Sequence, residues 1–128
     1  MPTRHRILVV DDNDALRENI SEALELEGYA VDAVGSGHLA LERLARGPLP
    51  GVVLVDMMMP GMSGPELLAA IRRDPRLAAL KLVLVSGHAP ARDGLPVDAV
   101  LGKPFGVTDL LALVERLLPP AAPAGPPG

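Results

Sequence analysis

The chain contains no cysteine and almost no aromatic residues. Its 128 residues include no Cys and no Trp, one Tyr and one Phe. Without cysteine there is no disulfide, no thiolate nucleophile and no thiolate metal site. With aromatics at 2%, the chain offers no platform on which the bases of single-stranded nucleic acid can stack, and its core must be aliphatic.

Neither sign of charge dominates, because 16 acidic and 12 basic side chains give a formal charge of −4. The arginines are scattered along the chain rather than gathered on one segment. Duplex binding normally requires a basic patch or stripe, so we expect this chain to bind no nucleic acid.

Long apolar runs are also missing. The opening Met1–Arg6 precedes only four apolar residues before Asp11, which is too short for a signal peptide or a membrane span. We therefore predict a cytoplasmic protein that does not contact a membrane.

Short apolar runs rich in valine recur along the chain. They occupy residues 7–10, 52–55 and 82–85, with weaker stretches at 30–34 and 99–102. Runs of this length and composition are typical of strands that are buried on both faces. The pattern predicts five short strands.

Between these runs the apolar residues recur with a helical period. Helix starts are predicted at Asn13 or Asp14, Ser36, Pro65 and Thr108. Helix ends are predicted at Gly28, Gly47 and Asp74. Alternation of strand and helix predicts a doubly wound α/β domain, an open parallel sheet with helices on both sides.

The length suits one domain, which we assign to residues 1–118. Residues 119–128 hold five prolines, three alanines and two glycines with no charge. Such a Pro/Ala/Gly-rich segment is predicted to be a disordered tail.

Polar side chains follow four of the predicted strands, at the point where each strand ends: Asp11 and Asp12, Asp56, Ser86 and Lys103. The carboxyl ends of parallel strands meet at one edge of a sheet, which is where ligands bind in such folds. Three neighbouring carboxylates repel one another unless a cation neutralises them, and Mg²⁺ prefers oxygen ligands. The sequence therefore predicts a magnesium site at this edge.

The remaining groups suit phosphoryl chemistry. A hydroxyl and an ammonium, Ser86 and Lys103, can bind two oxygens of a phosphoryl group. Asp56 stands alone at its strand end, while Asp11 and Asp12 form a pair, so Asp56 is the best candidate for a nucleophilic carboxylate.

Four segments in this order resemble the response-regulator receiver domain: Val-Val-Asp11-Asp12-Asn13, Val-Asp56-Met-Met-Met-Pro60-Gly61-Met-Ser-Gly64, Val-Ser86-Gly87 and Gly-Lys103-Pro104-Phe105. The resemblance covers residues 6–118. It implies a flavodoxin-like, five-stranded sheet of order 2-1-3-4-5, a Mg²⁺ or Mn²⁺ ion, and phosphoryl transfer from a histidine kinase to an aspartate.

By this resemblance Asp56 is the phosphoacceptor. The implied metal ligands are Asp11, Asp12, Asp56 and the backbone carbonyl of Met58. The resemblance further implies that Ser86 and Lys103 contact the phosphate and that the peptide bond before Pro104 is cis.

The chain departs from the family in two places. Only 16 residues separate Ser86 from Lys103, and they include Pro90, Gly94 and Pro96, so the fourth helix is predicted to be short or absent and residues 88–97 to form a mobile loop. Val100 stands where the family commonly has a switching aromatic residue. We therefore expect signalling not to use the dimer face that the fourth helix, fifth strand and last helix form in many receivers.

The predicted function is a phosphorylation-controlled switch that binds a protein partner, rather than a turnover enzyme. Alternatives are a phosphorelay intermediate, a receiver fragment of a larger hybrid protein, and a receiver that binds partners without phosphate. A small Mg²⁺-dependent aspartyl-phosphate phosphatase is disfavoured because Met58 stands where such enzymes need a second acid. A flavodoxin-like cofactor binder is disfavoured because no glycine-rich phosphate loop follows the first strand.

The remaining candidates have ordinary roles. His5, His38 and His88 lack metal-ligand spacing and are predicted to face solvent, with His88 bordering the site. Met57, Met58 and Met59 are either core filler or a soft contact surface near the site, and we favour a partly exposed, partner-contacting side chain at Met58. Tyr29 and Phe105 are interpreted as packing residues.

Overall fold

The computed structural model describes residues 5–87 and 96–118. Five parallel strands form one sheet of order β2-β1-β3-β4-β5. The strands are β1 Arg6–Val10, β2 Ala30–Val34, β3 Val52–Asp56, β4 Lys81–Ser86 and β5 Ala99–Gly102. The predicted doubly wound sheet, its order and its five strands are confirmed.

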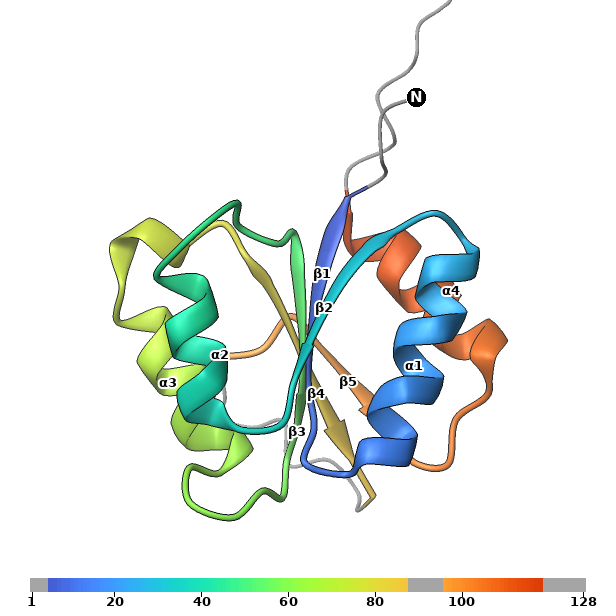
Figure 1. Cartoon of the computed structure of the whole chain (residues 1–128), viewed down its shortest axis with the longest axis horizontal. Helices are drawn as coiled ribbons and strands as arrows, with labels where there is room; N and C mark the ends of the chain where they lie inside the picture. Colours follow the sequence, from blue (N-terminus) through green and yellow to red (C-terminus); the bar gives the residue numbers. More distant parts are fainter. Residues whose placement is uncertain (1–4, 88–95, 119–128) are drawn as a thin grey trace, which may run out of the picture.

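Helices cover both faces of the sheet (Figure 1). They are α1 Asp14–Leu26, α2 Gly37–Leu44, α3 Gly64–Arg72 and α4 Val107–Leu117, with a short 3-10 helix η1 at Pro75–Leu77. Helices α2 and α3 lie on one face, and α1 and α4 lie on the other. The predictions of a short fourth helix and a mobile loop concern residues 88–97, most of which lie outside the described residues, as does the tail at 119–128.

Successive residues of each strand point to opposite faces and so build two cores. In β1, Ile7 and Val9 pack with α1 and α4, whereas Leu8 and Val10 pack with α2 and α3. Each of these four side chains is at most 1% exposed, and burying one aliphatic side chain contributes about 1.5–3 kcal/mol. The short valine-rich strands are therefore fixed from both sides.

Capping side chains begin the first three helices. The Oδ1 atom of Asn13 accepts a hydrogen bond from the backbone N–H of Leu16 at 3.0 Å, and Ser36 Oγ accepts one from Leu39 at 3.1 Å. Both caps were predicted. Pro65 lies in the first turn of α3 as predicted, but the cap itself is Ser63, which forms a capping box with Glu66.

The predicted cap of the last helix is wrong. Helix α4 begins at Val107, and Thr108 lies inside it rather than at its N-cap. The N-cap is Gly106, whose backbone N–H donates to the Asp109 carboxylate at 3.2 Å. An acid three residues into the helix therefore accepts from the N-cap N–H, while glycine has no side chain to accept from the first-turn N–H groups as a threonine cap would.

No helix in the described ranges 5–87 and 96–118 is long and apolar enough to cross a membrane. The domain boundary at residue 118 stays a prediction.

Candidate functional site

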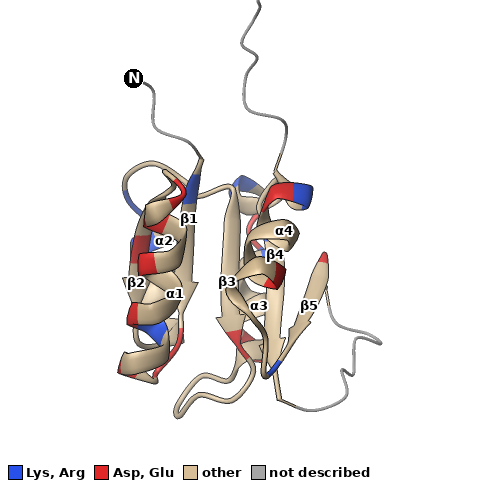
Figure 2. Cartoon of the chain, turned by 90° about the vertical axis from the view of Figure 1, so that its right-hand side faces the viewer, with Lys and Arg blue, Asp and Glu red and all other residues tan. Residues whose placement is uncertain are grey.

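The site forms where the strand order reverses. Strand β1 lies between β2 and β3, so the chain leaves β1 in one direction and returns on its other side. Asp11 follows the last residue of β1, and Asp56 is the last residue of β3. In Figure 2 acidic segments lie at the lower ends of β1 and β3, and a basic segment lies just beyond β5. Ligands of doubly wound folds bind at such a point.

Three carboxylates meet there. One oxygen from each of Asp11, Asp12 and Asp56 lies within 4.8 Å of the others. Asp11 is 2% exposed and Asp56 6% exposed, whereas Asp12 is exposed. Two of the acids therefore sit in the protein interior, and the third opens the cluster to solvent.

Lys103 approaches this cluster from β5. Its Nζ atom lies 2.9 Å from Oδ1 of Asp56, and its backbone N–H donates to the carbonyl of Ser86 at 2.8 Å. The peptide bond between Lys103 and Pro104 is cis, as the resemblance implied.

Negative charge is in excess at this edge of the sheet. Among the residues that the structure describes, Lys103 is the one cation that forms an ion pair with any of the three carboxylates, and its partner is Asp56. Burial raises the pKa of the Asp11 carboxyl above its ordinary value, and the nearby charges of Asp56 and Asp12 act in the same direction. The N–H of Asn13 and the ammonium of Lys103 oppose this rise. A divalent cation would relieve the excess.

The backbone around Asp11 holds its carboxyl in place. Oδ1 of Asp11 accepts from the N–H of Asn13 at 2.9 Å, and its carbonyl accepts from Arg17 at 2.8 Å. Arg17 also donates to Asp14 at 2.6 Å. The sequence analysis missed Arg17, although its spacing of three from Asp14 on a predicted helix is a recognisable signal.

Ser86 ends β4 and is 2% exposed. Its hydroxyl donates to the sulfur of Met57 at 3.4 Å. Met57 was not identified from the sequence as a contact of the site, and its position directly after Asp56 carries no specific signal. Met58 is 71% exposed, as predicted, and Met59 is buried.

The start of helix α3 packs closely against the backbone of Asp56. A Cβ atom at Gly64 would lie 2.5 Å from the carbonyl oxygen of Asp56, so only glycine fits there. The N–H of Gly64 donates to the carbonyl of Met57 at 3.0 Å. The first residue of α3 thus fixes the strand end that carries Asp56.

The sequence profile of the response regulator receiver domain matches residues 7–115. The chain belongs to this family. It is therefore the receiver domain of a two-component signalling protein, and the expected class is confirmed.

Curated relatives include the phosphate regulon transcriptional regulatory protein PhoB of Rhizobium meliloti, 33% identical over 123 residues, which covers 92% of this chain and 54% of PhoB. The sensor kinase CckA of Brucella abortus is 38% identical over 119 residues, covering 88% of this chain and 12% of CckA. The receiver thus spans about half of PhoB and a small part of CckA.

Solved structures of response regulators have a similar fold. The response regulator TrrA of Thermotoga maritima, in complex with Mg²⁺ and BeF, is 34% identical with a TM-score of 0.80, covering 89% of this chain and 99% of TrrA. The chemotaxis response regulator CheY4 of Vibrio cholerae is 26% identical with a TM-score of 0.84, covering 91% and 100%.

The other predicted residues of the receiver lie outside the carboxylate cluster. Val100 is partly buried against the core under α2 and α3, and Phe105 packs on the core under α1 and α4. Tyr29 is buried. His38 is exposed as predicted, but His5 is half-buried, and His88 lies outside the described residues.

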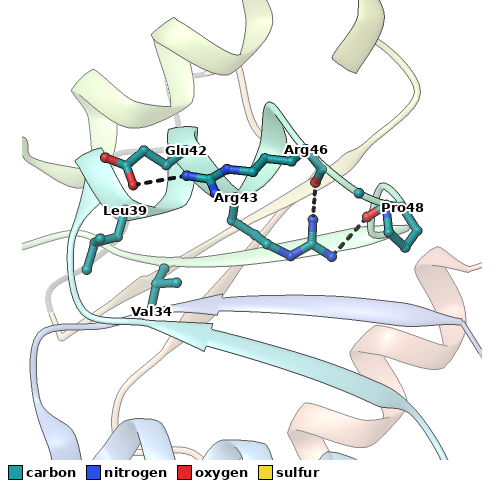
Figure 3. A pocket seen from close by; sticks show the side chains of 7 residues that line it. Val34, Leu39, Glu42, Arg43, Arg46 and Pro48 are labelled. Atoms are coloured by element: carbon teal, nitrogen blue, oxygen red, sulfur yellow. Dashed lines mark hydrogen bonds and ion pairs between the residues drawn. The ribbon is translucent and has the colours of Figure 1, made fainter.

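A separate hollow of about 440 Å³ lies beside α2 and β2 of the receiver (Figure 3). The guanidinium of Arg43 lies along it and donates to the carbonyls of Arg46 and Pro48, at 2.8 and 2.9 Å, and to Asp32 at 2.7 Å. These bonds commit Arg43 to fastening the turn after α2, so the hollow brings together no free group for chemistry.

Proposed function

We propose that Asp56 accepts a phosphoryl group from a sensor histidine kinase or a histidine phosphotransfer domain, and that this changes the affinity of the receiver for a downstream protein. One observation supports the proposal: the buried Asp56 carboxylate has an oxygen within 4.8 Å of oxygens of Asp11 and Asp12, and its Oδ1 lies 2.9 Å from the Lys103 ammonium. The receiver is then a substrate and a switch rather than a turnover enzyme.

The donor set fits Mg²⁺ or Mn²⁺. Three carboxylates offer oxygens within 4.8 Å of one another, and hard divalent ions take oxygen ligands and need the negative charge that this cluster has in excess. The ligands in this proposal are Asp11, Asp12, Asp56 and the backbone carbonyl of Met58. When bound, the ion neutralises the acids and polarises the oxygens of the incoming phosphoryl group.

The protein's own groups account for the remaining chemistry. An oxygen of Asp56 forms a bond to phosphorus while the bond between phosphorus and the donor's histidine nitrogen breaks, and the electron pair stays on the imidazole. Lys103 binds one phosphoryl oxygen and Ser86 donates to another, which stabilises the charge on the product. The aspartyl-phosphate phosphatase remains disfavoured, because the exposed Met58 cannot supply a proton.

The match to part of a sensor kinase favours a second candidate, in which the receiver passes its phosphoryl group on to a histidine of a phosphotransfer domain. Transfer of label from phosphorylated receiver to an added phosphotransfer domain would distinguish this relay from a terminal switch. The cytoplasmic location, the absence of nucleic-acid binding by this chain and the unused dimer face stay predictions.

The direct test is intact-mass measurement after incubation with acetyl phosphate and MgCl₂. We expect a gain of one phosphoryl group that hydroxylamine removes, as it does from an acyl phosphate, and no gain with a chelator or in Asp56→Asn. Asp32→Asn is the matched control, because Asp32 is also an ion-paired aspartate of the sheet but does not belong to the carboxylate cluster. A gain that persists in Asp56→Asn would contradict the proposal.

A further inference from the structure

The contact between Ser86 and Met57 is not explained by phosphoryl binding alone. The Ser86 hydroxyl is buried and donates to the Met57 sulfur at 3.4 Å. A thioether sulfur is a weak acceptor compared with a carbonyl or phosphoryl oxygen. A stronger acceptor can therefore displace this sulfur from the hydroxyl.

The backbone and the side chain of Met57 differ in freedom. Its backbone is fixed, because its N–H donates to the carbonyl of Val85 at 2.9 Å and its carbonyl accepts from Gly64 at 3.0 Å. Its side chain has three rotatable bonds and a polarisable sulfur, which lets it adapt to a changed environment. A change at Ser86 can therefore move the side chain of Met57 without moving the strand end that carries Asp56.

The Met57 side chain packs against the core under α2 and α3, as do Val97 and Val100. Val100 pairs with Leu84, two residues before Ser86. A β-branched valine is stiff about its first side-chain torsion and is too short to swing as an aromatic ring can. Of these two side chains on this face of the sheet, the one with the freedom to change its packing is Met57 and not Val100.

We propose that Met57 is a positioning residue of the switch. In the unphosphorylated receiver its sulfur accepts a hydrogen bond from the Ser86 hydroxyl. On phosphorylation the hydroxyl donates to a phosphoryl oxygen instead, and the thioether is released to repack. This inference rests on the proposed function of Asp56. It assigns to Met57 the movement that Val100 cannot make, and it carries the change from the site to the core under α2 and α3.

A thermodynamic cycle tests the inference. The affinity for beryllofluoride, a phosphoryl mimic, is measured by calorimetry in MgCl₂ for the wild type, Met57→Leu, Ser86→Ala and the double variant. We expect Met57→Leu to bind the mimic about threefold more tightly, because the Ser86 hydroxyl no longer has to break the hydrogen bond to the Met57 sulfur. In the Ser86→Ala background the same substitution is expected to have no effect.

Methyl spectra give an independent readout. With ¹³C-methyl methionine, the Met57 resonance is expected to shift on addition of the mimic in the wild type and to stay in place in Ser86→Ala. Met62→Leu is the matched control: Met62 packs against the same core, the chemical change is identical, and no contact with Ser86 is found among the described residues. Its mimic affinity is expected to equal that of the wild type.

The outcomes separate the two proposals. Equal mimic affinities in the wild type and Met57→Leu, together with an unmoved Met57 methyl resonance, would overturn the role of Met57 alone. An equal effect of Met57→Leu with and without Ser86 would also overturn it, because that effect would be general core packing. A wild type that binds no mimic would overturn the proposed function, and this inference with it.

Discussion

The two ends of the sheet differ in how far their acidic side chains are neutralised by basic ones. Away from the carboxyl end, Asp32 in the middle of β2 pairs with both Arg6 and Arg43, at 3.4 and 2.7 Å, and Asp98, just before β5, pairs with Arg72 at 2.9 Å. At the carboxyl end, three carboxylates lie together and, among the described residues, only Asp56 of the three has an ion-pair partner, the Lys103 ammonium. One end is balanced by the chain itself, and the other is not.

The balanced end joins elements. Oδ2 of Asp98 accepts from Arg72 and from the backbone N–H of Leu82 at 2.7 Å, which connects the end of α3 to the starts of β4 and β5. Such satisfied, partly buried groups hold segments in register. At the carboxyl end, repulsion among the carboxylates raises the free energy of the metal-free protein, and a bound cation lowers it again. The comparison indicates that the carboxyl end is built to bind and the amino end to stabilise.

Removing one acid from the carboxyl end should have the largest effect. Asp11→Asn is expected to weaken Mg²⁺ binding at least about 100-fold, since losing even an outer partner of a metal ligand costs 10- to 100-fold. Calorimetric titration with MgCl₂ measures this. Asp32→Asn is expected to leave the affinity unchanged, and an equal loss in both variants would show that the two ends do not differ.

Removing Lys103 should leave binding of a phosphoryl mimic possible but abolish the structural response to it. In Lys103→Ala we expect beryllofluoride to bind about tenfold more weakly, the value of one charge-assisted hydrogen bond. We also expect the amide shifts beyond the site to be lost. Amide spectra with and without the mimic measure both, and unchanged long-range shifts would count against the role of Lys103.

Breaking the amino end should affect stability alone. Asp98→Ala leaves the Leu82 N–H and the Arg72 guanidinium without this acceptor, so the free energy of unfolding should fall by about 2 kcal/mol. Urea denaturation measures this loss. The exposed pair of Glu42 with Arg46, at 3.7 Å, is the control, and Glu42→Ala should cost about 0.5 kcal/mol or less. Phosphoryl gain in Asp98→Ala should equal the wild type; a loss of phosphoryl gain would contradict the division of roles.

The smallest effect is expected at the start of α3, between the two ends. Ser63→Ala should lower the free energy of unfolding by about 1 kcal/mol. The hydrogen bonds from the Ser63 backbone N–H and side chain lower the pKa of Glu66. The variant keeps the backbone N–H, so only the side-chain part of this stabilisation differs between the two proteins; that part is present above the ordinary pKa of a glutamate and is lost as the pH falls through the lowered value. Urea denaturation between pH 7 and pH 3 checks this, and a difference between Ser63→Ala and wild type that grows towards pH 3 would contradict it.

The strand ends could be read from the sequence because short valine-rich runs stop at charged residues, and parallel strands bring those residues together. Asn13 and Ser36 were found because a cap is a local signal. Gly106 was missed because Asp109 caps it from inside the helix. The contact between Met57 and Ser86 could not be predicted, because it depends on the rotamers of two side chains on neighbouring strands.

Mg²⁺-dependent stability tests most directly whether the carboxyl end is short of positive charge. Burial raises the pKa of Asp11, so its ionisation destabilises the metal-free receiver as the pH rises through that value. Urea unfolding at pH 7 should show a gain of about 2.7 kcal/mol when Mg²⁺ is about 100 times its dissociation constant, and a gain of about 0.4 kcal/mol or less in Asp11→Asn at the same concentration. No gain in the wild type, or an undiminished gain in Asp11→Asn, would contradict this.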